Sequence, residues 1–504
     1  MPTDTPVKIA FNALVEDVMI LILAYCDMAD VVAFSGTSKY FHRVAFTGSI
    51  WRSLVSQLCQ RGYIDLRPNA EDLTKLSTEQ LVDLVKRVAH GPKAWGSVQS
   101  KPSNSRTIRR AKNLFRKMAR QLPVPKAPSQ PSEPPVSWRS VLHPEIAPGL
   151  HWDNFAKLLP GGKYVLFKNQ SCLECWSVAE DKPIWIQSPP ASTRYALPIV
   201  EFDASFLEDG RLVIVICTLE KLDTLPNSIQ VFTLDPKNGI SNLELFEFLP
   251  DSLTECCCTV CGDIVAVHFD SASPRSVLII NWRKASRTII TNESLMTLVL
   301  IPDYLVLSLH DRPGQHRLAA IPLCTLEFVR WRLNDSDTLD SPMKVAAFHI
   351  GAHNSIVVKG YRSAFGSLWA YECPLRRGHF KVWFHTWLQD RQNDYSICSY
   401  ELFIEKSSPH QTGLVSWRPL SSHRLPDVVY GSGMSLWGHT LGSRAHGYRA
   451  GPELFSAVPM DKQSRCHQIL TVNYPNLVRE VHLSPFSGAI TYSTHAELVI
   501  LHYE

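Results

Sequence analysis

The sequence lacks the features that mark a membrane protein, a small secreted protein or several common classes of enzyme. Its most apolar early run, residues 18–26, has nine residues, whereas a membrane-spanning helix needs about 20. Its 13 cysteines in 504 residues do not form a dense, regular disulfide framework. No phosphate loop, GxSxG nucleophile elbow, HExxH zinc motif or EF-hand loop occurs. The polar N-terminal segment MPTDTPVK differs from the basic start of a signal peptide. We therefore expect a cytoplasmic or nuclear protein, or one found in both places, that has no catalytic centre.

Two Cys-x-x-Cys pairs are the candidate metal ligands, Cys172 with Cys175 and Cys258 with Cys261. Together they could form a tetrahedral thiolate site for zinc. However, 82 residues separate the pairs, and the first pair lies at the start of a predicted strand. Buried, reduced thiols are therefore the favoured interpretation, and we expect no metal and no cofactor.

Positive charge is concentrated in one segment. The whole chain carries +4, but residues 101–126 contain nine basic residues and no acidic one. Within 105–122, apolar residues recur at steps of three and four and predict a basic amphipathic helix; they are Ile108, Ala111, Phe115, Met118 and Leu122. Three interpretations stay open: packing on a neighbouring domain, a nuclear-targeting or nucleic-acid patch, and a membrane-surface helix. Because the basic run lacks Trp and Tyr, we do not expect nucleic acid as a partner.

The N-terminal region predicts several short helices. Apolar residues at steps of four predict a helix over 15–26. Asp30 can cap a second helix that ends at Ser35, and Ser35 or Thr37 can cap a third that runs through Val44. Three short helices bury too little surface to be stable alone, so we expect a partner to cover their apolar face.

A further helix and a linker follow. Residues 71–90 predict an amphipathic helix, with Ser77 and Gln80 at the spacing of a capping box and Gly91 at its end. Residues 123–135 contain six prolines and predict a stiff, extended linker.

Residues 14–54 resemble an F-box. That family opens with a leucine and acidic residues, continues with an apolar helix and an aspartate, and closes on a tryptophan. The corresponding residues here are Leu14, Glu16, Asp17, Val18, Ile22, Leu23, Asp30, Val31, Val32, Ser35, Ser38, Lys39, Phe41, Ile50 and Trp51. Val15, Cys26 and Met28 replace the proline, leucine and proline that are usual in the family, but they keep the apolar character. Since Val15 lacks the fixed φ of proline, the helix is expected to start more loosely.

The resemblance implies a function. An F-box docks the Skp adaptor of cullin-RING ubiquitin ligases, so the chain is expected to be a substrate-recognition subunit of a Skp–cullin–F-box ubiquitin ligase, with an unidentified protein substrate. The residues implied in adaptor binding are Leu14, Val15, Val18, Ile22, Val31, Ile50 and Trp51. Trp51→Ala is expected to abolish that binding. The alternatives are a non-ligase scaffold, or a ligand-binding propeller on which the helices form an interaction or structural cap.

From residue 137 onward, short apolar strands alternate with turns. Turn dipeptides end at residues 162, 210 and 262, and a fourth turn follows at Pro302. Each unit contains two strands, for example 163–167 with 173–178, and 211–216 with 228–234. A repeat of this length with paired strands is typical of a propeller blade. The last strand, 497–503, fits a ring that an early strand within 138–152 closes. The opening LPGGKYV resembles the C-terminal half of many fungal F-box proteins, which is similar to a degenerate WD-repeat propeller.

The sequence therefore predicts an α+β multidomain protein. Residues 1–62 form an all-α F-box domain, residues 63–136 a helical and basic, proline-rich linker, and residues 137–504 an all-β, substrate-binding propeller of about seven blades. A pair of β-sandwiches and an irregular β-solenoid are the alternative folds for the last part.

Overall fold

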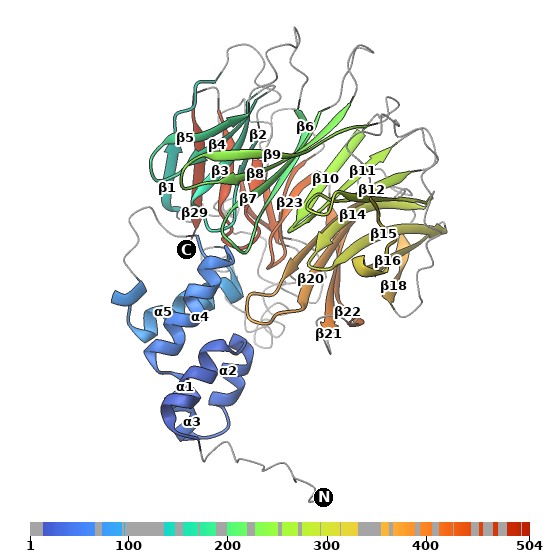
Figure 1. Cartoon of the computed structure of the whole chain (residues 1–504). Helices are drawn as coiled ribbons and strands as arrows, with labels where there is room; N and C mark the ends of the chain where they lie inside the picture. The colour runs from blue at the N-terminus through green and yellow to red at the C-terminus, as the bar shows by residue number, and fades with distance from the viewer. Residues whose placement is uncertain are drawn as a thin grey trace, which may run out of the picture.

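The computed structural model describes residues 14–65, 73–92, 95 and 136–146, and most of 155–503, where the longest gap is 331–353. The predicted basic helix at 105–122 and the proline-rich segment at 123–135 lie outside the described residues. Figure 1 shows the helices gathered at one end of a larger body of sheets.

The helices form one packed unit, which we call the helical module. It contains α1 (Glu16–Tyr25), α2 (Met28–Ser35), α3 (Lys39–Ala45), α4 (Gly48–Gln60), the 3-10 turn η2 (Leu73–Lys75) and α5 (Thr78–His90). The helices predicted at 15–26 and 71–90 are confirmed as α1 and as η2 with α5. The capping box is confirmed too: the Gln80 N–H donates to Ser77 Oγ at 3.3 Å, and the Ser77 N–H donates to Gln80 Oε1 at 2.8 Å.

Two predicted helix caps are wrong by a few residues. Helix α2 begins after Asp27, so Asp30 lies in its first turn, where a carboxylate still interacts favourably with the helix dipole. Helix α3 is capped by Ser38, whose Oγ accepts the Phe41 N–H at 3.1 Å. Serine, threonine and aspartate are all good caps, so the sequence alone does not fix which of several neighbours caps the helix.

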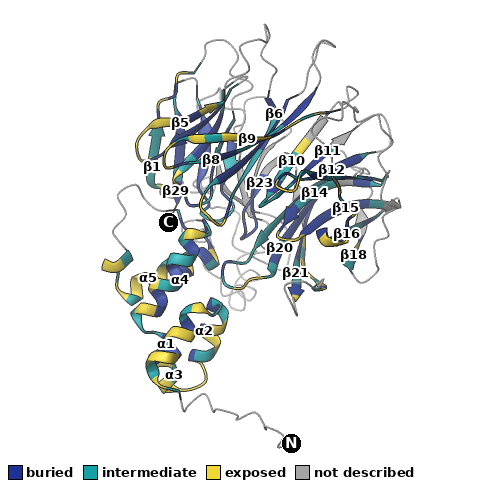
Figure 2. Cartoon of the chain, in the orientation of Figure 1, coloured by how far each residue is buried: buried dark blue, intermediate teal, exposed yellow. Residues whose placement is uncertain are grey.

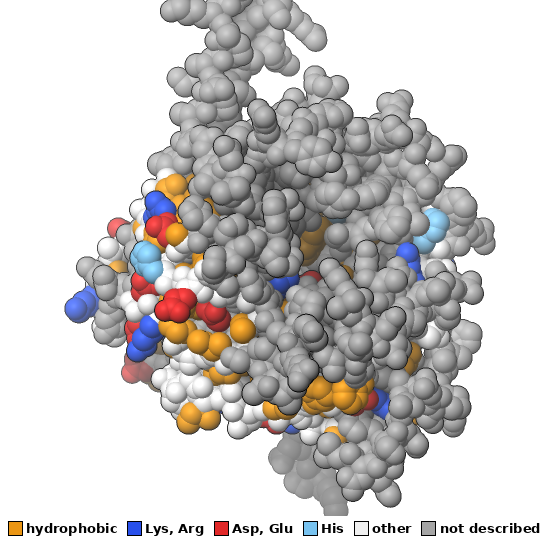
Figure 3. All heavy atoms as spheres, turned by 90° about the horizontal axis from the view of Figure 1, so that it is seen from above, with side chains coloured by type: hydrophobic (Ala, Val, Ile, Leu, Met, Phe, Trp, Pro, Cys, Tyr) orange, Lys and Arg blue, Asp and Glu red, His pale blue; other side chains and the backbone are white. Residues whose placement is uncertain are grey.

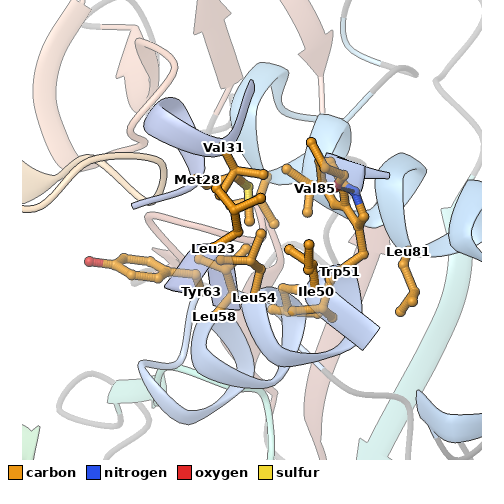
Figure 4. Packing of buried hydrophobic residues seen from close by; sticks show 14 of the residues in the cluster. Leu23, Met28, Val31, Ile50, Trp51, Leu54, Leu58, Tyr63, Leu81 and Val85 are labelled. Carbon is orange, nitrogen blue, oxygen red and sulfur yellow. Dashed lines mark hydrogen bonds between the residues drawn. The ribbon is translucent and has the colours of Figure 1, made fainter. Parts of the chain in front are cut away.

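The core of the helical module is built around α4. Trp51 is 2% exposed, and its indole N–H donates to the Ala45 carbonyl at 3.0 Å. Apolar side chains from α1, α2 and α5 pack against α4 (Figure 4). The buried set is Met19, Leu23, Met28, Val31, Val44, Ala45, Ile50, Trp51, Leu54, Val55, Leu58, Tyr63, Ile64, Leu81, Val85 and Val88. Residue 62, the predicted end of the F-box domain, thus lies between two helices that share one core.

The described part of the remaining chain forms seven antiparallel sheets, here called blades 1 to 7. Blade 1 contains β2 (Phe155–Leu158), β3 (Tyr164–Asn169), β4 (Cys172–Ser177) and β5 (Lys182–Gln187), and blade 2 contains β6 (Ile199–Phe206), β7 (Leu212–Thr218), β8 (Ser228–Asp235) and β9 (Ile240–Phe248). Blade 3 contains β10 (Glu255–Cys261), β11 (Ile264–Asp270), β12 (Ser276–Asn281), β13 (Ser286–Thr291) and the short β17 (Val329–Arg330). Blade 4 contains β14 (Leu295–Ile301), β15 (Tyr304–Arg312), β16 (Gly314–Pro322) and β18 (Ser355–Tyr361), with the 3-10 turn η4 (Leu323–Thr325) after β16.

The remaining blades complete the series. Blade 5 contains β19 (Gly366–Glu372), β20 (His379–Leu388), β21 (Asp394–Glu405) and β22 (Leu414–Pro426), and blade 6 contains β23 (Val428–Met434), β24 (His439–Arg444), β25 (Glu453–Ser456) and β26 (His467–Thr471). Blade 7 contains β27 (Val481–Leu483), β28 (Ile490–Ser493) and β29 (Leu498–Tyr503), together with β1 (Val136–Leu142) from the start of the domain.

The blades form a closed ring. The first strand of one blade contacts the first strand of the next at β6 and β10, β10 and β14, β14 and β19, β23 and β27, and β27 and β2. One apolar cluster joins blades 1 and 2, and β21 of blade 5 contacts β23 of blade 6. Strand β1 pairs with β29, as with Leu142 opposite Leu498, so the early strand closes the last blade as predicted. The domain is a seven-bladed β-propeller, and the two alternative folds are excluded.

In blades 1, 2, 3 and 7 the sequence located the two middle strands, and in blade 4 it located the second strand; no strand of blades 5 and 6 was predicted. The predicted pair at 163–167 and 173–178 corresponds to β3 and β4, the second and third strands of blade 1. The first and fourth strands, here β2 and β5, were not predicted. Gly431 and Gly433 belong to β23, where the pairing register shifts between them.

Candidate functional site

The outer side of helix α1 carries a row of exposed apolar side chains, which we call the α1 face. Val15 is 68% exposed and Tyr25 is 82% exposed. The complete set is Val15, Val18, Leu21, Ile22 and Tyr25; Val32 of α2 is also exposed. Figure 2 shows α1, α2 and α3 with much exposed surface.

Helix α1 exposes these residues because it is apolar almost all round. Its sequence, EDVMILILAY, directs Met19 and Leu23 into the core, and Ile20 packs against that core. Val18, Leu21, Ile22 and Tyr25 then face solvent. Exposed apolar patches on soluble proteins usually mark interaction sites. The α1 face is therefore the candidate surface for binding another protein.

The seven residues implied in adaptor binding fall into two groups. Val15, Val18 and Ile22 lie on the α1 face, and Leu14 is half-buried. The other three lie in the core and are at most 2% exposed; they are Val31, Ile50 and Trp51. In this structure their side chains support the helices and do not reach the surface.

The opposite side of the helical module packs on the propeller along a surface that we call the docking seam. On the module it comprises residues 27–29, 61–65, 88–92 and Trp95; on the propeller it comprises turns 159–163, 373–378, 435–438 and 484–489 with Glu372 and His502. Each of these turns joins the first and second strands of a blade, so all four lie on one face of the ring. We call it the helix-bearing face.

Polar groups on both sides of the docking seam pair directly. The Ala29 N–H donates to the Leu375 carbonyl at 3.0 Å, and the Trp437 indole N–H donates to the Val88 carbonyl at 3.0 Å. Each pair joins residues more than 340 positions apart. Trp95 is 1% exposed and lies against the rings of Trp437, His439 and Tyr503.

A half-buried charge network lies at the end of α4. Arg61 Nη2 donates to Glu372 Oε2 at 2.7 Å and to the Tyr63 hydroxyl at 2.9 Å. That hydroxyl in turn donates to Glu372 Oε2 at 3.0 Å. Burial, together with the negative charge of Glu372, raises the pKa of Tyr63, so the phenol stays protonated and able to donate.

Two glycines allow the backbones to meet at the docking seam. Gly62 has φ +75°, and a Cβ there would lie 2.4 Å from Pro160 Cβ. Gly162 has φ +70°, and a Cβ there would lie 2.7 Å from Asp65 Cβ. A side chain at either position would clash, and the positive φ also favours glycine. The Gly161–Gly162 turn, predicted to introduce a strand, therefore also receives the helical module.

Asp65 is the most deeply buried carboxylate of the docking seam. Burial raises the pKa of Asp65 to about 7, while hydrogen bonds from the Ser487 side chain and the Gly161 backbone act in the opposite direction. Its Oδ2 has no hydrogen-bond partner within the described residues, and His502 Nδ1 lies 3.8 Å away. The cost of burying this charge makes the docking seam sensitive to pH.

A cavity of about 1240 Å³ opens on the helix-bearing face. It lies between the end of α4 and the turns of blades 1, 2, 4 and 5. Its charged lining mixes basic and acidic groups: Arg61, Lys163, Lys237, Arg377, Glu208, Asp209 and Glu372. Two of these, Arg61 and Glu372, belong to the network of the docking seam.

The candidate zinc ligands lie in two different blades, Cys172 and Cys175 in blade 1, and Cys258 and Cys261 in blade 3. Among the described residues, no three His, Cys, Asp or Glu side chains gather in a way that could hold a metal ion. Cys175 is buried, which raises its pKa to about 12, whereas Cys172, Cys258 and Cys261 are only partly buried. The described helices include none that is both long and apolar enough to cross a membrane.

Comparison with known proteins identifies the first part of the helical module. The model of the family described as F-box-like matches residues 16–57, which span α1 to α4. Residues 16–57 are an F-box-like domain. The match indicates a role in protein interaction, and the α1 face is the exposed apolar surface of this domain.

No curated protein matches the chain. Similar solved structures include the WD40 domain of SCAP from fission yeast, at 12% identity and a TM-score of 0.39, over 69% of this chain and 84% of that one. The fission yeast complex of the SREBP–SCAP binding domains matches at 14% identity and a TM-score of 0.35, over 66% and 95%. Extracellular domains 1–2 of Drosophila semaphorin 1a match at 7% identity and a TM-score of 0.34, over 73% and 87%.

Sequence reasoning missed two members of the α1 face and the whole docking seam. Leu21 and Tyr25 are exposed but were not singled out, and Val32, an exposed residue of the F-box motif, was not among those implied in adaptor binding. A second helical stripe, at positions 15, 18, 22 and 25, was the signal that could have revealed Tyr25. The docking seam joins residues hundreds of positions apart, and a single sequence carries no pattern for such pairs.

Proposed function

We propose that this protein is the substrate-recognition subunit of a Skp–cullin–F-box ubiquitin ligase. The F-box-like domain would bind the Skp adaptor through the α1 face, and the propeller would hold a protein substrate. The observation that carries the proposal is the exposed apolar α1 face on a domain whose opposite side is anchored to the propeller. A surface of that kind is expected to be covered by a partner.

The docking seam supports the ligase function geometrically. Its direct contacts fix the F-box-like domain relative to the propeller, so an adaptor on α1 and a substrate on the ring would be held at a set distance. Such positioning raises the effective concentration of the substrate near the activated ubiquitin. On this proposal the chain supplies proximity and no catalytic residue, and it acts in the cytoplasm, the nucleus or both.

The substrate would bind the face opposite the helical module. The helical module contacts turns on one face of the ring, such as 159–163 and 484–489, whereas strands β5 and β7 end at the opposite face, which none of the described helices contacts. Variable loops on a rigid scaffold are the usual place for binding residues. Seen from that side, the described hydrophobic, acidic and basic side chains are interspersed (Figure 3), which suits recognition of a protein.

The test is co-expression of the full chain with a Skp adaptor, followed by affinity purification and size-exclusion chromatography. The double variant Val18→Glu/Ile22→Glu places charge on the α1 face and should weaken adaptor binding at least about tenfold, as expected for central apolar contacts. Because both residues are exposed, the melting temperature should stay close to that of the wild type. The matched control Leu414→Glu changes an exposed residue on β22 and should leave binding unchanged.

Two results would contradict the proposal. If the wild-type chain is folded and does not bind the adaptor, the helical module is a structural cap. If the α1 variant binds as tightly as the wild type, the adaptor uses another surface. A complex that forms but transfers no ubiquitin to captured substrates in a reconstituted ligase would favour a non-ligase scaffold.

A further inference from the structure

Strand β9 is the outer edge of blade 2, and it lacks the usual protection of an exposed edge. It pairs with β8 on one side, and no described strand pairs with its other side. Its sequence, ISNLELFEF, contains no Lys, Arg, His or Pro. Natural proteins usually place such residues on edge strands to prevent further pairing.

The other outer strands do carry such protection. Strand β5 has Lys182 and Pro183, β22 has Arg418 and Pro419, and β1, β18 and β26 each contain a basic residue or a histidine. In blade 3, the edge of β13 is covered by the added strand β17. This chain therefore already contains one blade that a fifth strand completes.

The backbone of β9 offers free hydrogen-bonding groups next to its exposed side chains. The Leu249 N–H, just after the strand, donates to the Asn227 carbonyl beside β8 at 2.7 Å. In an antiparallel pair, successive residues alternate between facing the partner strand and facing away. The N–H and C=O groups of Phe248 and Phe246 therefore point toward the unpaired edge.

The exposed side chains of β9 form an apolar patch on the face turned toward blade 1. Leu243, Phe246 and Phe248 are each about half exposed, and the two phenylalanine rings are 5.0 Å apart. Phe246 is opposite Gln230, which accepts a hydrogen bond from Gln187 of blade 1. A bulge at Glu244, held by the Thr233 hydroxyl at 2.6 Å, separates Leu243 from the regular stretch 245–248.

The charged residues of the strand are all negative. Its two charged residues are both glutamates. Glu247 is paired with Arg287 of blade 3, and Glu244 is exposed. Two copies of β9 placed side by side would bring four glutamates to one seam, which disfavours pairing of the strand with itself.

We propose that residues 245–248 of β9 dock an extended segment of a partner protein, which adds to blade 2 as a fifth strand. The segment pairs with the free backbone groups of Phe246 and Phe248. It places apolar side chains at alternate positions against the two rings and a basic residue near Glu244. This site is separate from the α1 face and does not depend on adaptor binding.

A random library of ten-residue peptides displayed on phage, selected against the full chain, tests the proposal. Counter-selection uses the double variant Phe246→Ser/Phe248→Ser, whose changes lie on the surface and should leave the fold intact. The enriched peptides should alternate apolar residues and carry a basic residue. Measured by fluorescence anisotropy, their affinity for the variant should be at least about tenfold weaker. The matched control Leu414→Ser/Leu420→Ser removes exposed apolar residues from β22 and should bind as the wild type does.

A backbone-blocked peptide decides between strand addition and simple apolar contact. The enriched peptide, N-methylated at alternate amides so that its edge cannot donate, should lose at least about tenfold in affinity. Equal binding of the methylated peptide would overturn the proposal, as would a library in which no peptide distinguishes the variant from the wild type. Concentration-dependent dimers in sedimentation velocity that the Phe246→Ser/Phe248→Ser variant abolishes would identify a second copy as the occupant and would also overturn it.

Discussion

The two sides of the helical module differ in how their side chains are satisfied. On the docking seam, Arg61, Tyr63 and Glu372 pair with one another, and glycine allows close backbone contact. On the α1 face, Val18 and Tyr25 are apolar and exposed. The docking seam, which packs on the same chain, combines charged, polar and apolar contacts at close distance, whereas the α1 face is an exposed row of apolar side chains.

The difference also separates two kinds of residue that the F-box motif lists together. Trp51 and Val18 are both apolar members of the motif, yet Trp51 is 2% exposed and Val18 is 43% exposed. Loss of Trp51 removes the centre of a core, while a change at Val18 alters only the surface. Experiments that measure stability and binding together can therefore distinguish them.

The largest effect is expected for Trp51→Ala. Removing this side chain and its hydrogen bond to Ala45 should reduce the free energy of unfolding of the F-box-like domain by about 3–5 kcal/mol. Adaptor binding should be lost with it, because the α1 face depends on the same core. Urea denaturation followed by circular dichroism, together with adaptor binding, provides the measurement. If Trp51→Ala stayed as stable as the wild type and lost only binding, Trp51 would be a contact residue. The assignment of Trp51 to the core and of Val18 to the surface would then be wrong.

A smaller effect is expected for Gly62→Ala at the docking seam. The new Cβ would lie 2.4 Å from Pro160 Cβ. Gly210→Ala is the matched control, since Gly210 has φ +84° against +75° for Gly62 but meets no atom within 4 Å. The cost of placing alanine at a positive φ should therefore be similar in the two variants and cancel in the comparison. We expect Gly62→Ala to lower the free energy of unfolding by about 1–3 kcal/mol more than Gly210→Ala. Equal melting temperatures would mean that the docking seam is not tightly packed.

A third effect, which is spread over several pH units, is a pH dependence that Asp65 confers. Its pKa in the folded chain is about 7, above the ordinary value of 3.8, so between these values the folded state holds a proton that the unfolded state has lost. Stability should therefore fall as the pH rises through this interval, by at most about 1.4 kcal/mol per pH unit.

Comparison with Asp65→Asn isolates this contribution. The variant keeps a neutral side chain at all pH values, so its free energy of unfolding should decline less steeply between pH 5 and 7 in urea titrations. Asp209→Asn, on an exposed turn of blade 2, should follow the wild type. Parallel curves for Asp65→Asn and wild type would show that the docking seam does not respond to pH in this range.

Within the propeller, how far an element could be predicted depended on its burial. Strand β7 is buried along its whole length, and its run LVIVICT was recognised from the sequence. The first strand of the same blade, β6, contains Glu201 and Asp203, and Asp203 pairs with Lys157 of blade 1. The outer strand, β9, is mostly exposed. Neither side strand carries the continuous apolar pattern of a strand buried on both faces, so neither was found.

The sequence by itself determined the F-box-like helices, the period of the blades and the closing of the ring by an early strand, because hydrophobic spacing and turn residues act over short distances. The tertiary structure alone decided which motif residues are core and which are surface. It also decided where the F-box-like domain rests on the propeller and which blade edge stays unpaired. These features depend on contacts between residues far apart in the chain, such as Arg61 with Glu372, and local propensity does not encode them.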